Sequence, residues 1–126
     1  MDRIFTLIAA VSGFLSVAIG AFAAHGLAEK VDEHMLEIFK TGALYQTTQS
    51  LALLAVAILV SKSPLSRALF ISGWAFVFGI VVFSGSLYLL VLLNMPVLGA
   101  ITPVGGVGLL VGWLCLCWHC WQTYTN

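Results

Sequence analysis

The chain has 126 residues, of which 61% are hydrophobic and only 8% are charged, with a formal net charge of +0. A soluble domain carries about a quarter charged residues, and a chain this short exposes too much surface to bury the apolar excess. The composition therefore excludes an ordinary soluble domain and indicates a membrane protein. With five basic residues and no net positive charge, nucleic acid is not an expected partner.

The first apolar run extends from Ile4 to Ala28 without a charged residue. It predicts a membrane-spanning helix near 4–24, because about 20 apolar residues cross the hydrocarbon core. The run resembles a signal peptide, and Ala21-Phe22-Ala23 imitates a cleavage site. It is nevertheless longer than the apolar region of about 7–15 residues that is typical of such peptides. We therefore expect a retained span that ends near His25.

The segment from Glu29 to Lys40 holds most of the remaining charge. Its apolar residues recur at helical spacing, and its acidic residues occupy other faces. We expect an amphipathic connector helix between the first two spans, with Asp32 as its N-cap, which lies along the interface and then continues into the second span. It is either a solvated connector or a docking surface for another subunit, and its acidic face argues against a polybasic lipid-binding device. The apolar positions are Val31, Met35, Ile38 and Phe39, and the acidic ones are Glu29, Asp32, Glu33 and Glu37.

Two further charge-free stretches account for the other spans. Thr41–Ser61 predicts a second span near 43–61, and Lys62 and Arg67 lie in the link after it. Everything beyond Arg67 lacks charge and would be about 88 Å long as one helix, so it must turn back. The sequence "NMPVLG" from Asn94 to Gly99 marks that turn, which gives spans near 68–92 and 98–119.

These spans predict one integral membrane domain over residues 1–126, with an all-α fold. Unpaired backbone groups are prohibitive in lipid, and no strict alternation of apolar and polar residues suggests a barrel. We expect a four-transmembrane-helix bundle with both termini on the same side. That side carries Arg3, Lys62 and Arg67, and the other carries Lys30 and Lys40. The positive-inside rule then favours cytoplasmic termini.

Each span also carries uncharged polar residues, and alternating helix direction places all of them in the same half of the membrane. Polar groups are poorly tolerated toward lipid, so these side chains are expected to point inward. We predict a polar pocket near the His25 end whose mouth opens toward Glu29–Lys40. Its candidate ligand-binding residues are His25, Tyr45, Gln46, Gln49, Ser84, Tyr88 and Thr102.

Two interpretations of this cluster stay open. The side chains could serve only to form hydrogen bonds between the helices, or they could bind a small ligand, a lipid headgroup or a proton. His25 is the best single candidate for a site, because its charge changes near neutral pH. Thr102-Pro103 either begins a helix, with Thr102 as N-cap, or kinks a longer one.

Small residues predict close helix packing. On the first span they recur every four residues, and the fourth span presents a face of glycines; such positions let two backbones approach closely. A wide permeation pathway is not expected through helices packed in this way. The positions are Ser12, Ser16, Gly20 and Ala24 on the first span, Ala75 and Gly79 on the third, and Gly105, Gly108 and Gly112 on the fourth.

The C-terminal sequence "CLCWHC" contains residue types that bind zinc or copper. On one helix, however, Cys115 and His119 share one face while Cys117 and Cys120 share another. Four ligands cannot converge from such a helix, so no metal and no cofactor is predicted. Trp113, Trp118, Trp121 and Tyr124 are interpreted as an aromatic belt at one interface. No soluble catalytic motif is present, and the chain is predicted to be non-enzymatic.

Four motifs in order resemble the YgdD-like family of small bacterial inner-membrane proteins of unknown function. They are "AFAAHG" at 21–26, "YQ" at 45–46, "FSGSLY" at 83–88 and "TPVGG" at 102–106. Ala23 replaces the usual glycine of the first motif, and Gln49 replaces a histidine expected after "YQ", which weakens any model that needs two imidazoles. The resemblance implies a four-helix inner-membrane protein without an established activity.

Two functional hypotheses follow. The first is a non-enzymatic accessory protein that binds lipid or a partner, with membrane lipids, a homo-oligomer or a larger membrane complex as its associates. The second is a small oligomeric transporter or proton-coupled carrier that uses the polar pocket. An intramembrane enzyme is the weakest alternative, because no pair resembles a nucleophile with its activating base.

Overall fold

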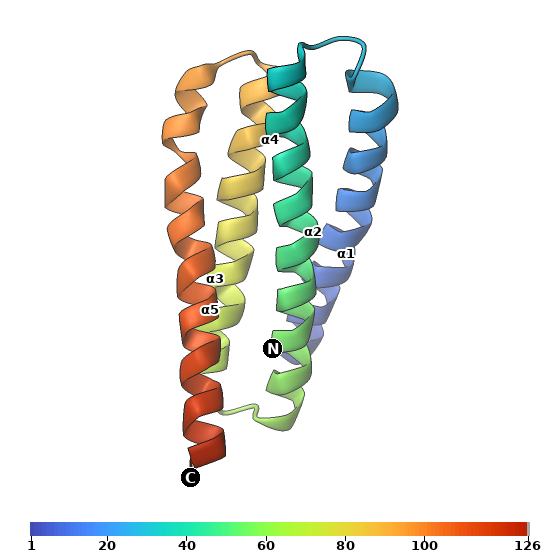
Figure 1. The fold of residues 1–126 in the computed structure, drawn as a ribbon. Coiled ribbons are helices and arrows are strands. Elements are labelled where there is room, and N and C mark those ends of the chain that lie inside the picture. The colour runs from blue at the N-terminus through green and yellow to red at the C-terminus, as the bar shows by residue number, and fades with distance from the viewer. Residues whose placement is uncertain (126) are drawn as a thin grey trace.

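The computed structural model describes residues 1–125, which form four long helical spans. Each span is long and apolar enough to cross a membrane: Asp2–Leu27, Glu33–Lys62, Arg67–Leu92 and Pro96–Thr125. Both ends of the chain lie at one end of the molecule, and the connections at 28–32 and 93–95 lie at the other (Figure 1). The all-α architecture with four spans is therefore confirmed.

The spans are longer than expected, and two of them contain irregular turns. The first comprises α1 (Asp2–Phe22) and the π-helical turn η1 (Ala23–Leu27), and the second is α2 (Glu33–Lys62). The third comprises α3 (Arg67–Gly79), the π-helical turn η2 (Ile80–Ser84) and α4 (Gly85–Leu92). The fourth comprises the 3-10 turn η3 (Pro96–Ala100) and α5 (Thr102–Thr125). Such π turns inside helices occur frequently at functional sites.

The connector does not form a separate helix between the first two spans, and its expected continuation into the second span is observed. Its residues form the first turns of α2, which runs unbroken from Glu33 to Lys62. No proline interrupts this stretch, and a break would leave orphan carbonyl and amide groups near the membrane. Two further parts of the expectation are confirmed. The Asp32 carboxylate caps α2 by accepting a 2.8 Å hydrogen bond from the Met35 amide, and Met35 and Phe39 pack inward while Glu37 stays exposed.

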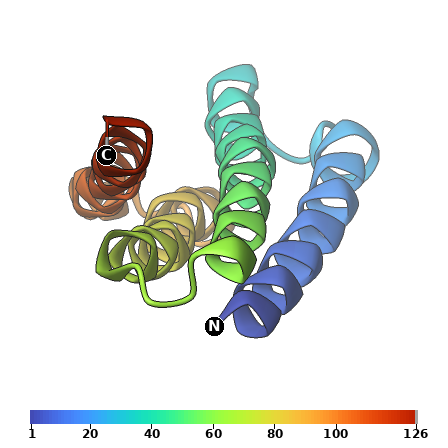
Figure 2. The ribbon, with the colours of Figure 1, turned by 90° about the horizontal axis from the view of Figure 1, so that it is seen from below.

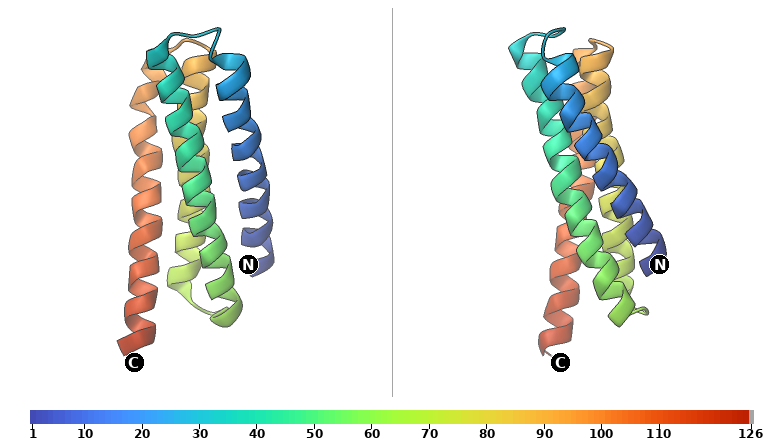
Figure 3. Two further views of the ribbon diagram at one scale, coloured as in Figure 1. Left: turned by 45° about the vertical axis from the view of Figure 1, so that its right-hand side comes forward. Right: turned by 90° about the vertical axis from the view of Figure 1, so that its right-hand side faces the viewer.

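The helices form an open arrangement in which two inner helices are flanked by two outer ones. α1 packs mainly against α2, α5 packs mainly against α3, and α2 packs against α3, η2 and α4. Figure 2 shows α1 and α5 on opposite sides of the molecule, and Figure 3 shows the same four helices from two further directions. In the most apolar stretch of each span, 22% of the first and 17% of the fourth is buried, against 50% and 44% for the second and third. The outer helices therefore present most of their surface to the bilayer.

Two apolar clusters hold the helices together. The lower one, nearer the termini, includes Phe5, Leu53 and Phe76, and the upper one joins Ala23, Leu27, Phe39, Leu90 and Val91. Burying such side chains does not drive association in lipid, where tails are equally apolar, so close packing has to stabilise the contacts.

The predicted glycine face on the fourth span is confirmed as a close helix contact. A Cβ atom added at Gly105 would lie 2.3 Å from the backbone nitrogen of Phe83, and one added at Gly79 would lie 2.8 Å from that of Leu109. The stripe on the first span is close-packed only in part, because Ser12 and Ser16 are buried whereas nothing lies within 4 Å of a Cβ at Gly20.

The turn before the fourth span lies where "NMPVLG" indicated. Asn94 takes up a positive φ of 52°, a conformation that asparagine tolerates better than most residues. α5 begins at Thr102, so the helix-start alternative is confirmed. The expected N-cap role of Thr102 is not observed, because its hydroxyl lies 2.6 Å from that of Ser86 and is used to join two spans.

Candidate functional site

A buried hydrogen-bond network centred on Gln46 joins three spans. The Tyr88 hydroxyl donates to Gln46 Oε1 at 2.6 Å, and Gln46 Nε2 donates to the backbone oxygen of Ser12 at 3.0 Å. The hydroxyls of Ser12 and Ser50 lie 2.7 Å apart. Among the described residues, no buried side-chain nitrogen or oxygen lacks a partner. The polar groups therefore satisfy one another without a ligand, as the interhelical interpretation expects.

Two further serines connect the spans near this network. The buried Ser84 hydroxyl donates to the backbone oxygen of Gly42 at 2.8 Å, which ties η2 to α2. The Tyr88 ring lies directly against Gly42, where an added Cβ would come within 2.8 Å of it. Ser84 and Tyr88 thus share the face of the third span that contacts α2, as their four-residue spacing predicts.

A cleft of about 510 Å³ lies between α1 and the third span, with the network at its base. This volume falls within the range of about 300–1,000 Å³ that is typical of ligand sites. Its walls are apolar and come from Leu7, Ile8, Val11 and Leu15 on α1 and from Val77, Ile80 and Val81 opposite. Its base is polar and includes Ser12, Gln46, Ser84 and Tyr88.

Aromatic contacts join α1 and α2 to the third span on either side of this cleft. At the lower end Phe5 of α1 packs on Gly73 and meets Trp74 edge-on, with ring centroids 5.4 Å apart. At the upper end Phe39 packs on Tyr88, with centroids 4.9 Å apart. The predicted opening toward Glu29–Lys40 is not supported, because no residue of that segment lines the cleft. The cleft opens sideways between α1 and the third span.

Gln49 and Tyr45 lie on a different face of α2 from Gln46. Gln49 Oε1 accepts a 2.9 Å hydrogen bond from the indole nitrogen of Trp113 on α5. The Tyr45 ring lies 4.7 Å from that of Phe83. Both residues line a separate cavity of about 380 Å³ toward α5. The predicted single pocket is thus divided in two by α2, because the helical repeat groups Gln46 with Gly42 and Ser50, and Gln49 with Tyr45.

The other two predicted residues lie outside both cavities. His25 is exposed within η1, and it lines neither the cleft nor the α5-side cavity. Thr102 contacts Ser86 at the start of α5 and lines neither of them. Gln46, Ser84 and Tyr88 are therefore the predicted residues that the fold brings together at one cleft. Ligand binding by any of the seven stays a prediction.

One polar contact was not foreseen from the sequence. His119 is buried, and its Nδ1 lies 2.9 Å from Oγ of Ser66, which also caps α3 by accepting a hydrogen bond from the Leu69 amide. A serine just before an apolar run is a recognisable cap signal, but only the tertiary fold shows its second partner. Within residues 1–125, no group of three or more His, Cys, Asp or Glu side chains is close enough to hold a metal ion.

Comparison with known proteins places these features in a family. Residues 19–106 match the family model described as "Protein of unknown function (DUF423)". The chain belongs to this family. The resemblance to the YgdD-like proteins is thereby confirmed, and this DUF423 protein is an integral, multi-pass membrane protein.

Curated relatives of this DUF423 protein are similar over nearly their whole length. The UPF0382 membrane protein YwdK of Bacillus subtilis is 39% identical over 112 residues, covering 89% of this chain and 91% of the relative. A UPF0382 membrane protein of Haemophilus influenzae is 40% identical over 116 residues, covering 92% of each chain. One from Staphylococcus aureus (strain bovine RF122) is 39% identical over 114 residues, covering 90% and 92%. No solved structure matches the chain significantly.

Proposed function

We propose that the protein is a non-enzymatic accessory protein of the membrane that binds a lipid acyl chain in the cleft between α1 and the third span. The observation that carries this proposal is the cleft itself, which has apolar walls and opens sideways to the bilayer. Val11 and Val81, on opposite walls, are 49% and 65% exposed. A lipid tail reaches such a cleft without leaving the hydrocarbon region.

The residues at the base of the cleft offer little to a proton-coupled carrier. Gln46 and Tyr88 are hydrogen-bonded to each other and leave the cleft base without a free ionisable group for a carrier cycle. His25, on which a proton-coupled carrier would depend, does not line the cleft. The transporter alternative therefore gains no support from this arrangement.

The Ser66–His119 pair also fits a structural role better than a catalytic one. The Ser66 oxygen already accepts the Leu69 amide, and the second ring nitrogen of His119 lies 3.4 Å from the Thr123 hydroxyl. A nucleophilic serine requires a base that a third group, commonly a carboxylate, orients. The neighbours of His119 are hydroxyl groups, so the pair serves as a hydrogen bond that connects the start of α3 to α5.

For location we propose the inner membrane, with both termini in the cytoplasm. The start of α1 and the connection between α2 and α3 lie at the end of the molecule that carries the termini, and their basic residues are Arg3, Lys62 and Arg67. The connection between α1 and α2 and the first turns of α2 lie at the opposite end and contain Lys30 and Lys40. An excess of basic residues in short loops marks the cytoplasmic side.

Native mass spectrometry after purification in a gentle detergent tests lipid binding in the cleft. The wild-type protein is expected to retain lipid, and Val11→Trp, which fills the cleft from α1, is expected to retain less of it. Val17→Trp is the matched control, because Val17 lies on the same helix, is 71% exposed and does not line the cleft. A wild-type monomer without lipid, or equal retention by Val11→Trp and Val17→Trp, would contradict the proposal.

A further inference from the structure

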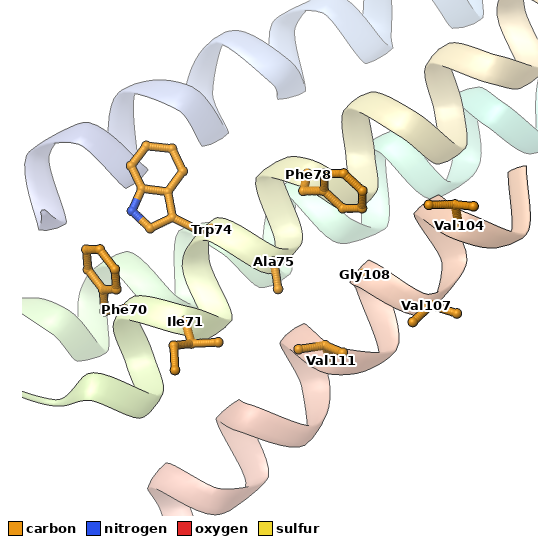
Figure 4. Close-up of a pocket in the computed structure, with 9 residues that line it drawn as sticks. All are labelled: Phe70, Ile71, Trp74, Ala75, Phe78, Val104, Val107, Gly108 and Val111. Atoms are coloured by element: carbon orange, nitrogen blue, oxygen red, sulfur yellow. The ribbon is translucent and has the colours of Figure 1, made fainter. Parts of the chain in front are cut away.

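A second, longer groove runs between α3 and α5. One part of it, of about 720 Å³, lies between α3 and the first half of α5 (Figure 4). A second part, of about 560 Å³, lies nearer the end of the molecule that carries the termini. Both parts are lined by Ile71, so they adjoin along the same pair of helices.

The inner part of this groove has the character of an acyl-chain site. Figure 4 shows Ile71 and Ala75 of α3 pointing toward α5, which contributes Val107, Gly108 and Val111 to the groove. Trp74 and Phe78 extend the α3 wall. The helix rise places Phe78 about 16 Å along the axis from Arg67, close to the roughly 15 Å thickness of half a hydrocarbon core.

The outer part of the groove includes polar side chains and one basic side chain. It is lined by Arg67, Ser66 and Gln122, with Trp118 beside them. Arg67 is exposed at the first turn of α3, and within residues 1–125 no carboxylate lies within salt-bridge distance of it. An arginine binds phosphate through several N–H groups, and the N-terminal end of a long helix adds a favourable field for an anion. The Ser66–His119 hydrogen bond holds the two walls together at this end.

We propose that this groove binds one anionic phospholipid, with its phosphate at Arg67 and Gln122 and one acyl chain between α3 and α5. The inference goes beyond the proposed function, because it uses a different groove and a different chemical selectivity. A second copy of the chain fits the groove less well. A copy with the same membrane orientation brings only the Asp2 side-chain carboxylate to this end of the molecule, since the other acidic residues lie at 29–37.

Titration of the full-length protein with phosphatidylglycerol or phosphatidylcholine, followed by native mass spectrometry, tests the proposal. Phosphatidylglycerol is expected to bind more tightly than phosphatidylcholine. Arg67→Gln should weaken phosphatidylglycerol binding about fivefold, with Arg67→Lys recovering much of it. Val111→Trp should weaken both lipids tenfold or more, because each displaced methylene loses burial.

Two control variants distinguish lipid binding in this groove from binding in the other cleft. Lys62→Gln removes a basic residue at the same end of the molecule but outside the groove, and Val11→Trp fills only the other cleft; both should keep the wild-type preference for phosphatidylglycerol. Equal affinity for the two lipids, or an equal loss in Lys62→Gln and Arg67→Gln, would overturn the inference. So would a wild-type dimer that Val111→Trp dissociates. None of these results bears on the cleft lined by Val11, which its own pair of variants tests.

Discussion

The phenol hydroxyl of Tyr88 donates a 2.6 Å hydrogen bond to the side-chain oxygen of Gln46, 42 residues earlier in the chain. This bond ties α4 to α2, and the amide nitrogen of Gln46 continues the connection to Ser12 on α1. One glutamine therefore fixes the depth at which three spans meet, and the base of the cleft depends on it.

Tyr88→Phe should lower the free energy of unfolding by about 1 kcal/mol. Interhelical hydrogen bonds in membranes contribute about 0.6 kcal/mol on average, and Gln46 Oε1 would also be left without its donor. Unfolding by sodium dodecyl sulfate in mixed micelles measures this. The double variant Tyr88→Phe/Gln46→Leu should lose less than the sum of the two single variants. Strict additivity would show that the two side chains do not interact.

Gly105→Ala should lower the free energy of unfolding by about 1–3 kcal/mol, the usual range for overpacking. The added methyl group would meet the Phe83 backbone, which cannot move aside as a flexible side chain can. Gly13→Ala is the control, because nothing lies within 4 Å of its added Cβ. That change should be neutral or stabilising by up to about 1 kcal/mol. The same assay compares both variants, and an equal response would argue against close packing of α5 on η2.

Asp32→Ala should destabilise the first turn of α2 by about 1 kcal/mol, because the Met35 amide loses its capping acceptor. Hydrogen exchange should then become faster at 34–36, while the amides in the middle of α2 keep their protection. Asp32→Asn retains an acceptor and should behave like wild type. Unchanged exchange in Asp32→Ala would mean that the cap contributes little in the membrane.

The proposed orientation predicts the labelling of single cysteines in intact cells. In a background with Cys115, Cys117 and Cys120 replaced by alanine, Glu29→Cys should react with a membrane-impermeant maleimide, whereas Ser63→Cys should not. Both should react after the cells are permeabilised. The reverse pattern would place the termini outside the cell.

The sequence by itself determined that the protein lies in a membrane, how many times it crosses it, and that its spans are helices. Apolar runs such as Ile4–Ala28 are separated by a few charges and by "NMPVLG", which fixes where the spans lie. The spans have to be helical because lipid penalises both charges and unpaired backbone groups. Local signals were equally readable, since the capping by Asp32 depends only on residues three positions apart. These features follow from neighbours along the chain and from the medium around it.

Only the tertiary structure decided which polar residues meet. Gln46 and Gln49 lie three residues apart, yet one bonds to Tyr88 and the other to Trp113, because α2 is packed between different helices on its two sides. The same packing leaves His25 exposed and brings Ser66 to His119. Contacts of this kind depend on where small residues such as Gly79 and Gly105 let backbones approach. That approach sets the lateral position and rotation of each helix, which a pattern along one chain does not specify.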